Sequence, residues 1–182
     1  MLKWLIRNRL AAFEKKFGYD ASYVRDILAA DSRAFFAFAS TQKLKYRRDV
    51  PRDAYWSANL VGTVSEDCGP CTQLVVAMAL ADGADPDVLA AVLDGNEAAL
   101  PEQVRLAVTF ARAALAHAPE AGAARDEIVR RWGPRALISI AFALAAARIY
   151  PTIKYALGHG KACQRVTVAG RPIAVRRVEA AA

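Results

Sequence analysis

Apolar residues recur at intervals of three and four along most of the chain, which is the spacing of one face of an α-helix. The first such stretch, residues 1–17, carries an apolar stripe opposite a basic side, and Gly18 follows as a stop. The stripe consists of Leu2, Leu5, Ile6, Leu10, Phe13 and Phe17. It predicts packing against the body of the protein or against a neighbouring subunit, with contact to a membrane surface as the alternative.

Helix starts and stops predict further helices up to residue 157. One begins near Asp20 or Ser22 and continues toward the aromatic residues at 35–38, after which residues 41–48 form a loop or a frayed helix end. The later helices share a proline-containing start or a glycine stop, and they are expected at 51–62, 72–81, 86–93, 101–117, 122–132 and 135–157. Near residue 163 the apolar spacing changes to two, which is typical of extended chain.

The composition favours one helical domain over residues 1–182. The length is sufficient to bury a core, and the hydrophobic fraction of 55% rests heavily on alanine. We therefore predict an all-α helical bundle with N-terminal helices in 1–48, a core in 50–160 and a C-terminal extended arm or hairpin in 163–178. The longest apolar run, residues 136–147, is too short to span a bilayer, so no membrane span is expected.

Charge and cysteine usage narrow the partners and the compartment. The net charge is +7, but the basic residues gather around 43–48 and in the tail, without a helix-turn-helix spacing or a stacking platform. No nucleic-acid partner is therefore predicted. Lysines and arginines interrupt the N-terminus, so no secretory signal is visible, and three cysteines suit a reducing compartment. The expected location is cytoplasmic.

The sequence Cys68-Gly69-Pro70-Cys71 is the one stretch that packing does not explain. Pro70 suits the first turn of a helix, so both thiols are expected at the N-terminus of the apolar helix that follows. Unpaired amides and the helix dipole favour a thiolate there. The spacing predicts a reversible disulfide between Cys68 and Cys71, with Cys163 left free.

Two other chemistries fit the same cysteines. Cys-Gly-Pro-Cys is also the tetrapeptide of thioredoxin-like proteins, with Leu60 to Val64 as the preceding strand, although helices rather than a second βαβ unit follow. A metal site is the other alternative, because Cys68, Cys71, His159 and Cys163 form a Cys3His set with plausible ligand spacing. His159 also reads as part of an ordinary helix C-terminus.

The residues from Ser65 to Gln73, at the head of an Ala/Val/Leu helix, resemble the AhpD-like, carboxymuconolactone decarboxylase superfamily. The resemblance covers roughly residues 50–160. It implies an all-α fold, a homo-oligomer (a trimer or hexamer), no cofactor, and a cysteine pair that reduces hydroperoxides. A disulfide is the alternative substrate, and the expected electron donor is a protein or small thiol that the sequence does not identify. The family pattern assigns the attack on peroxide to Cys71 and the resolving role to Cys68.

The sequence departs from the peroxidase members of that superfamily at two positions. Val75 stands where they carry a histidine, and Trp56 stands where they carry a relay glutamate. Glu66 is the nearby carboxylate, so it is the candidate proton acceptor, with helix capping beside Asp67 as the alternative. These departures leave open a non-catalytic interaction protein or a lactone lyase, although a lyase needs no cysteine pair.

Overall fold

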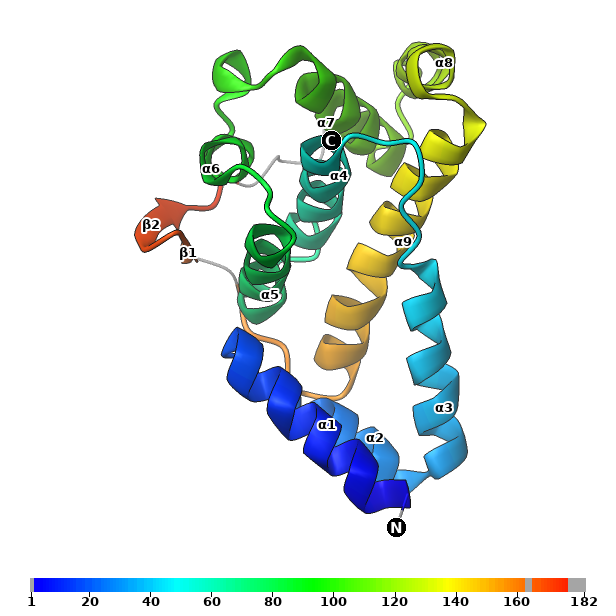
Figure 1. The fold of residues 1–182 in the computed structure, drawn as a ribbon, viewed down its shortest axis with the longest axis vertical. Helices are drawn as coiled ribbons and strands as arrows, with labels where there is room; N and C mark the ends of the chain where they lie inside the picture. The colour runs from blue at the N-terminus through cyan, green and yellow to red at the C-terminus, as the bar shows by residue number, and fades with distance from the viewer. Residues whose placement is uncertain (1, 163–164, 177–182) are drawn as a thin grey trace.

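The computed structural model describes residues 2–162 and 165–176, and within these ranges it is an all-α fold with one small hairpin (Figure 1). The N-terminal helices are α1 (Leu2–Phe17), α2 (Ser22–Ala30), α3 (Ser32–Ser40) and the 3-10 helix η1 (Thr41–Leu44). The remaining elements are α4 (Arg52–Val64), α5 (Gly69–Ala81), α6 (Pro86–Asp94), η2 (Glu97–Ala99), α7 (Glu102–Leu115), α8 (Ala121–Trp132), α9 (Pro134–Ala156), β1 (Arg165–Val168) and β2 (Arg171–Ala174). The predicted fold class is confirmed.

Helix α4 is the centre of the body and packs against α5, α6, α7 and α9 (Figure 1). The sequence predicts a helix over 51–62 that ends at Gly62, but α4 runs through this glycine to Val64. A Cβ atom at position 62 would lie 3.0 Å from Ala147 Cβ and 3.3 Å from the Leu144 carbonyl oxygen of α9. The glycine therefore lets α4 and α9 approach closely, which explains its place inside a helix.

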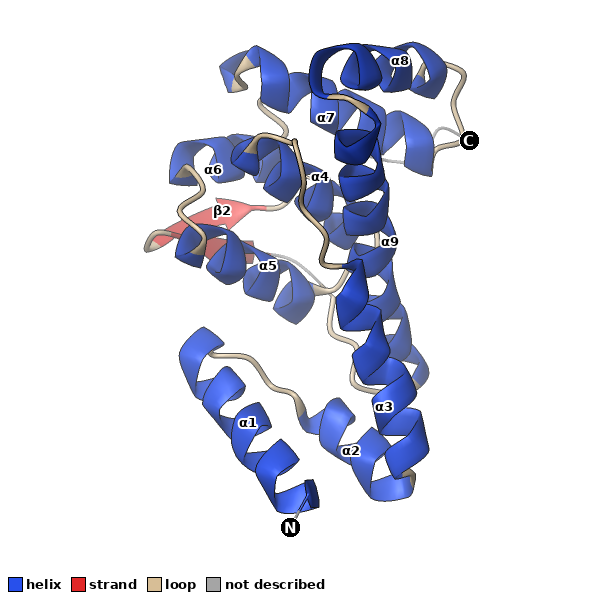
Figure 2. Ribbon diagram, turned by 45° about the vertical axis from the view of Figure 1, so that its right-hand side comes forward, coloured by secondary structure: helices blue, strands red, loops and turns tan. Residues whose placement is uncertain are grey.

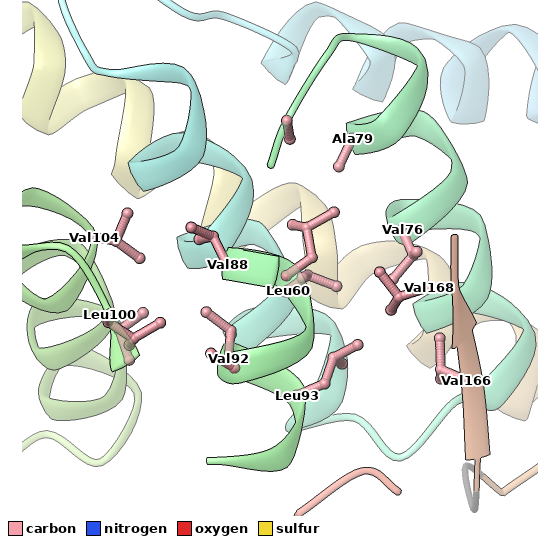
Figure 3. Close-up of a cluster of buried hydrophobic side chains, with 14 residues drawn as sticks. Leu60, Val76, Ala79, Val88, Val92, Leu93, Leu100, Val104, Val166 and Val168 are labelled. Atoms are coloured by element: carbon pink, nitrogen blue, oxygen red, sulfur yellow. The ribbon is translucent and has the colours of Figure 1, made fainter. Parts of the chain in front are cut away.

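The C-terminal hairpin is part of the core rather than a loose arm. Val166 and Val168 of β1 are fully buried and join the apolar cluster between α4, α5, α6 and α7 (Figure 3). The strands pair antiparallel, with Val166 opposite Ile173. The Arg176 amide donates to the Leu93 carbonyl of α6 at 2.8 Å, which fixes the segment after β2. Of the two forms predicted for this region, the hairpin is the one observed.

The N-terminal helices form a separate apolar cluster at the end of the molecule opposite α8 (Figures 1 and 2). The expectation of one helix from Asp20 or Ser22 to the aromatic residues is wrong, because the chain breaks at Asp31. Asp31 is extended (φ −155°), and its carboxylate accepts a hydrogen bond from the Arg33 amide at 2.7 Å. Asp31 thereby caps α3 and separates it from α2.

Helix α1 packs on the body with only part of its predicted stripe. Ile6, Leu10, Phe13 and Phe17 are half-buried against the N-terminal cluster. Leu2 and Leu5 belong to the same predicted stripe but remain 59% and 51% exposed. Glu14 ties the helix to α2 by accepting a hydrogen bond from Arg25 at 2.6 Å. The start of α1 therefore projects from the body with apolar residues uncovered.

Helix α9 is 23 residues long and, among the described helices, is the only one long and apolar enough to cross a bilayer by length and composition. The helix is thus longer than the apolar run 136–147, from which the sequence analysis expected no membrane span. However, 44% of its apolar window is buried inside the protein, and core helices pass the same test. The structure gives no clear membrane span, because α9 is packed against α4, α7 and α8.

Candidate functional site

The cysteine motif occupies the start of α5, as the sequence predicts. Cys68 is the residue before the helix (φ −107°, ψ 99°), Pro70 lies in the first turn, and Cys71 completes that turn. Both thiols are free and buried, with Cys68 at 0% and Cys71 at 4% exposure. The two cysteines are therefore brought together in the reduced state, at the end of the helix where backbone amides point outward.

Cys68 is the sulfur that favours the negative charge. Its pKa is lowered to about 7, chiefly by a hydrogen bond from the Cys71 thiol, while burial acts in the opposite direction. The Cys71 amide, the positive charge of Lys154 and the Lys161 amide lower it further. The chain after α9 thus contributes to the site, and it is held there by a 3.0 Å hydrogen bond from the Gly69 amide to the Lys161 carbonyl.

Cys71 keeps its proton for the same reason. Its pKa is raised first by the hydrogen bond to Cys68, then by burial and by the charge on Cys68, whereas Lys154 and Tyr19 act against this rise. The pair therefore holds one shared proton near neutral pH, with the proton on Cys71 and the charge on Cys68. Sequence reasoning placed both thiols at an activating helix start but did not separate their roles in this way.

Lys154 is a site residue that the sequence analysis missed. It lies on α9, is 2% exposed, and places its ammonium 4.6 Å and 5.3 Å from the ring centroids of Tyr19 and Tyr23. No carboxylate among the described residues forms an ion pair with it. A buried ammonium is stabilised by nearby negative charge, and Lys154 acts electrostatically on the cysteine pair and on the carboxylate of Asp20. The one sequence feature that could have indicated this role is the position of Lys154, a single lysine near the end of an apolar helix.

Tyr19 completes the surroundings of Cys71. Its hydroxyl oxygen lies 4.0 Å from Cys71 Sγ, and burial raises the pKa of Tyr19 far above its ordinary value. Burial also raises the pKa of Tyr23, which shares a hydrogen bond with Tyr19. Both hydroxyls therefore stay protonated, and the Tyr19 hydroxyl can donate a hydrogen bond to Cys71 or to a bound oxygen atom. Nothing in the local sequence distinguishes these tyrosines from core residues.

The structure does not bring Glu66 to the thiols. Its carboxylate pairs with Arg148 Nε at 2.5 Å and accepts a hydrogen bond from Thr152 Oγ1 at 3.3 Å, both on α9. The alternative capping role is not seen either, because Cys68 is the residue that precedes the helix. Glu66 thus links the turn before the motif to α9. Its part as a proton acceptor stays a prediction.

The proposed metal ligands are only partly described. His159 contacts α2 through both ring nitrogens, with Nδ1 3.2 Å from Ser22 Oγ and Nε2 2.9 Å from Asp26 Oδ2. Cys163 lies outside the described residues. Within residues 2–162 and 165–176, no group of three or more histidine, cysteine, aspartate or glutamate side chains is arranged to hold a metal ion.

The thioredoxin-like reading is not consistent with the backbone. Residues 60–64, its candidate strand, belong to helix α4. The only sheet in the described part of the chain is the two-stranded antiparallel hairpin β1–β2, which follows the motif by about ninety residues. The chain shares the Cys-Gly-Pro-Cys tetrapeptide with thioredoxin-like proteins, but here the tetrapeptide follows one helix, α4, and forms the start of the next, α5.

A cavity of about 740 Å³ separates the N-terminal helices from α4, α5 and α9. Cys71 lines it, whereas Cys68 does not. Val75 and Trp56, the two positions at which the sequence departs from the peroxidase pattern, also line it. The volume lies within the range of small-molecule pockets. Among the two thiols, Cys71 is thus the one that a small molecule in the cavity can reach.

Comparisons with known proteins returned nothing for this chain: no family model matches, and neither the curated proteins nor the solved structures gave a significant match.

Proposed function

We propose that the protein is a thiol–disulfide redox enzyme that reduces hydroperoxides by cycling Cys68 and Cys71 between dithiol and disulfide. The observation that carries this proposal is the asymmetry of the pair. A protonated Cys71 lines a small-molecule cavity, while the buried Cys68 behind it favours the thiolate. Such a perturbed pair beside a cavity is typical of a functional site. An AhpD-like helical protein acting in a reducing, cytoplasmic environment fits this arrangement.

The first step is an attack by Cys71 on the distal peroxide oxygen. The Cys71 proton moves to the Cys68 thiolate as the Cys71 sulfur forms its bond to oxygen and the O–O bond breaks. The leaving alkoxide takes a proton from the Cys68 thiol, and Tyr19 can donate a hydrogen bond to it because its hydroxyl is protonated. The products are an alcohol, a sulfenic acid on Cys71 and a thiolate on Cys68. In this scheme Cys68 is the proton acceptor that Glu66 was expected to be.

The second step closes the disulfide. The Cys68 thiolate attacks the Cys71 sulfenic acid, an S–S bond forms, and hydroxide leaves and is protonated to water. One hydroperoxide is thus reduced by two electrons, and both come from the cysteine pair. An external protein dithiol or small thiol then restores the two thiols. Because Cys71 lines a cavity of small-molecule size, a small hydroperoxide can reach its sulfur.

The test is a single-turnover titration of the reduced protein with cumene hydroperoxide. We expect one mole of hydroperoxide to be consumed per chain, with the loss of two thiols and a disulfide that maps to Cys68 and Cys71. In Cys68→Ser, a sulfenic acid should accumulate on Cys71 and react with dimedone. Labelling on Cys68 in Cys71→Ser, or a bridge to Cys163, would contradict the assigned roles.

We also propose that the chain works as a homo-oligomer, a trimer or hexamer as in the family it resembles. Ile138 and Phe142 on α9 are 44% and 38% exposed, and Leu2, Trp4 and Leu5 on α1 are exposed as well. Exposed apolar faces on a helical body of this size are typical of subunit contacts. Light scattering at micromolar concentration measures this directly, and a stable monomer of 19.7 kDa would contradict it.

A further inference from the structure

The cavity beside Cys71 has an apolar wall and an excess of positive charge. Its apolar lining includes Phe13, Phe35, Leu74, Val75 and Met78. Its charged lining consists of three cations, Arg9, Lys45 and Arg47, and one carboxylate, Asp82. This lining suits an apolar molecule, and the excess of cations favours one that also carries a negative charge.

Most polar groups in the lining are already satisfied by the protein. Asp82 pairs with Arg47 at 2.6 Å and accepts a hydrogen bond from Trp56 Nε1 at 2.8 Å. Gln42 donates to the Tyr150 hydroxyl at 2.7 Å. Asp82, the one carboxylate of the lining, is therefore engaged by Arg47 and Trp56. It does not form an ion pair with either of the other two cations of the lining.

Lys45 and Arg9 are those remaining cations. Neither forms an ion pair with any acidic side chain in the part of the chain that the structure describes. Partial desolvation lowers the pKa of Lys45, but both Lys45 and Arg9 keep exposed side chains at the edge of the cavity. Lys45 follows η1 and reaches the cavity from one side, whereas Arg9 reaches it from α1. Both cations are therefore available to the acidic group of a molecule that is bound in the cavity.

The cavity opens between the start of α1 and α3. Leu2 and Phe36 both line it, and their side chains remain 59% and 50% exposed. Trp4 and Leu5, next to Leu2, are also exposed. An elongated apolar molecule can therefore enter between these helices and reach the wall that contains Cys71.

We propose that this cavity binds an anionic amphiphile of the fatty-acid type, with its apolar chain beside Cys71 and its acidic head at Lys45 and Arg9. Binding does not depend on the thiols, because the contacts come from the apolar wall and the two cations. The role of the amphiphile as a substrate, in the form of its hydroperoxide, rests on the proposed function. The chemistry is the same whether the acid comes from solution or from a membrane.

Binding is tested by calorimetry on the Cys71→Ser protein, in which the redox reaction cannot occur. Dodecanoate should bind once per chain, and dodecanol, which lacks the charge, should bind on the order of 10-fold more weakly. Lys45→Gln should remove this preference, while Lys43→Gln, a neighbouring exposed lysine that does not line the cavity, should retain it. Equal binding of the two compounds, no binding of either, or an unchanged preference in Lys45→Gln would overturn the site. Circular dichroism of each variant checks that the fold is intact.

The source of the acid and its link to catalysis are separated by two further measurements. A fluorescent fatty acid is transferred from phosphatidylglycerol vesicles to the protein: a rate that rises with protein concentration indicates collection from the membrane, and a constant rate indicates uptake from solution. Either result supports the amphiphile site, and no transfer counts against it. If dodecanoate binds but the reduced native protein consumes no hydroperoxide, the proposed function fails and the site stands. If cumene hydroperoxide is reduced but dodecanoate does not bind, the site fails and the function stands.

Discussion

The body formed by α4–α9 and the N-terminal helices α1–α3 bury their apolar residues to different degrees. In the body, whole helix faces are buried, as in α6, where six consecutive residues from Val88 to Leu93 are covered. In α1 no residue is fully buried, and Leu2, Trp4 and Leu5 are exposed. The cavity lies between these two regions. The difference indicates that the body provides most of the stability and the side of the cavity that contains Cys71. The N-terminal helices form the other side of the cavity and should have a lower local stability.

The largest expected effect is the loss of hydroperoxide turnover when Cys71, on the body side of the cavity, is replaced. Cys71→Ser should reduce hydroperoxide turnover by at least about a thousandfold, because serine is a far weaker nucleophile than a cysteine thiolate. Cys163→Ser, the matched control, should leave turnover unchanged. Turnover with cumene hydroperoxide at constant reductant is the measurement. Turnover in Cys71→Ser close to that of the native protein would place the chemistry elsewhere.

The second-largest effect concerns stability, which should differ between substitutions in the body and in the N-terminal helices. Leu60 in α4 and Leu28 in α2 are both fully buried, so their replacement by alanine removes the same atoms from two different clusters. Leu60→Ala should lower the free energy of unfolding of the whole protein by about 2–5 kcal/mol. Leu28→Ala should speed amide hydrogen exchange in α1–α3 while leaving exchange in α4 and α7 slow. Equal effects of both changes on α4 would show that the two regions unfold together.

A smaller effect is expected from removal of the positive charge of Lys154, which lies between the thiols of the body and the tyrosines of the N-terminal region. Lys154 lowers the pKa of both thiols, so its removal in Lys154→Met should raise that of Cys68 from about 7. At pH 7 the thiolate fraction then falls, and turnover should drop on the order of 10-fold and recover as the pH rises. Lys154→Arg, which keeps the charge, should restore part of the rate at pH 7. A pH profile that does not move in Lys154→Met would exclude this role.

The smallest effect is expected at Glu66. Its carboxylate is engaged by Arg148 and Thr152, so Glu66→Gln should change turnover by less than about threefold, without a shift of the pH profile. Arg148→Gln, which removes the other half of the pair, should behave in the same way. A rate in Glu66→Gln that falls tenfold or more, while Arg148→Gln stays near normal, would establish Glu66 as the proton acceptor.

The sequence predicted the elements whose signals are local. Asp85-Pro86 marks the start of α6 within one residue, and the Asp85 carboxylate accepts from the Asp87 amide at 2.8 Å. The same holds for the cysteine pair, since Cys-Gly-Pro-Cys and the helix after it are adjacent in the chain. The break at Asp31 was missed because a single capping aspartate resembles any other polar residue on an amphipathic helix.

Residues that reach the site from a distance could not be predicted in this way. Tyr19 and Lys154 meet Cys71 only through the packing of α9 and the N-terminal helices on α5, and neither has a local pattern. Glu66 was selected because it is two residues from Cys68, yet its side chain turns to α9. Closeness in sequence is a poor guide to side-chain contact outside regular secondary structure.

The buried ammonium of Lys154 also has a consequence for the reduction potential of the cysteine pair. In the reduced protein the shared negative charge of the pair compensates this ammonium. Formation of the disulfide removes that charge from the sulfurs and leaves the carboxylate of Asp20 as the negative charge on which Lys154 acts. The reduced form is therefore stabilised relative to the oxidised form, which shifts the potential toward the oxidising side, since a dithiol stabilised by its surroundings makes its disulfide a stronger oxidant. Under the proposed function, this shift would favour the return of the pair to the dithiol by an external thiol after each hydroperoxide.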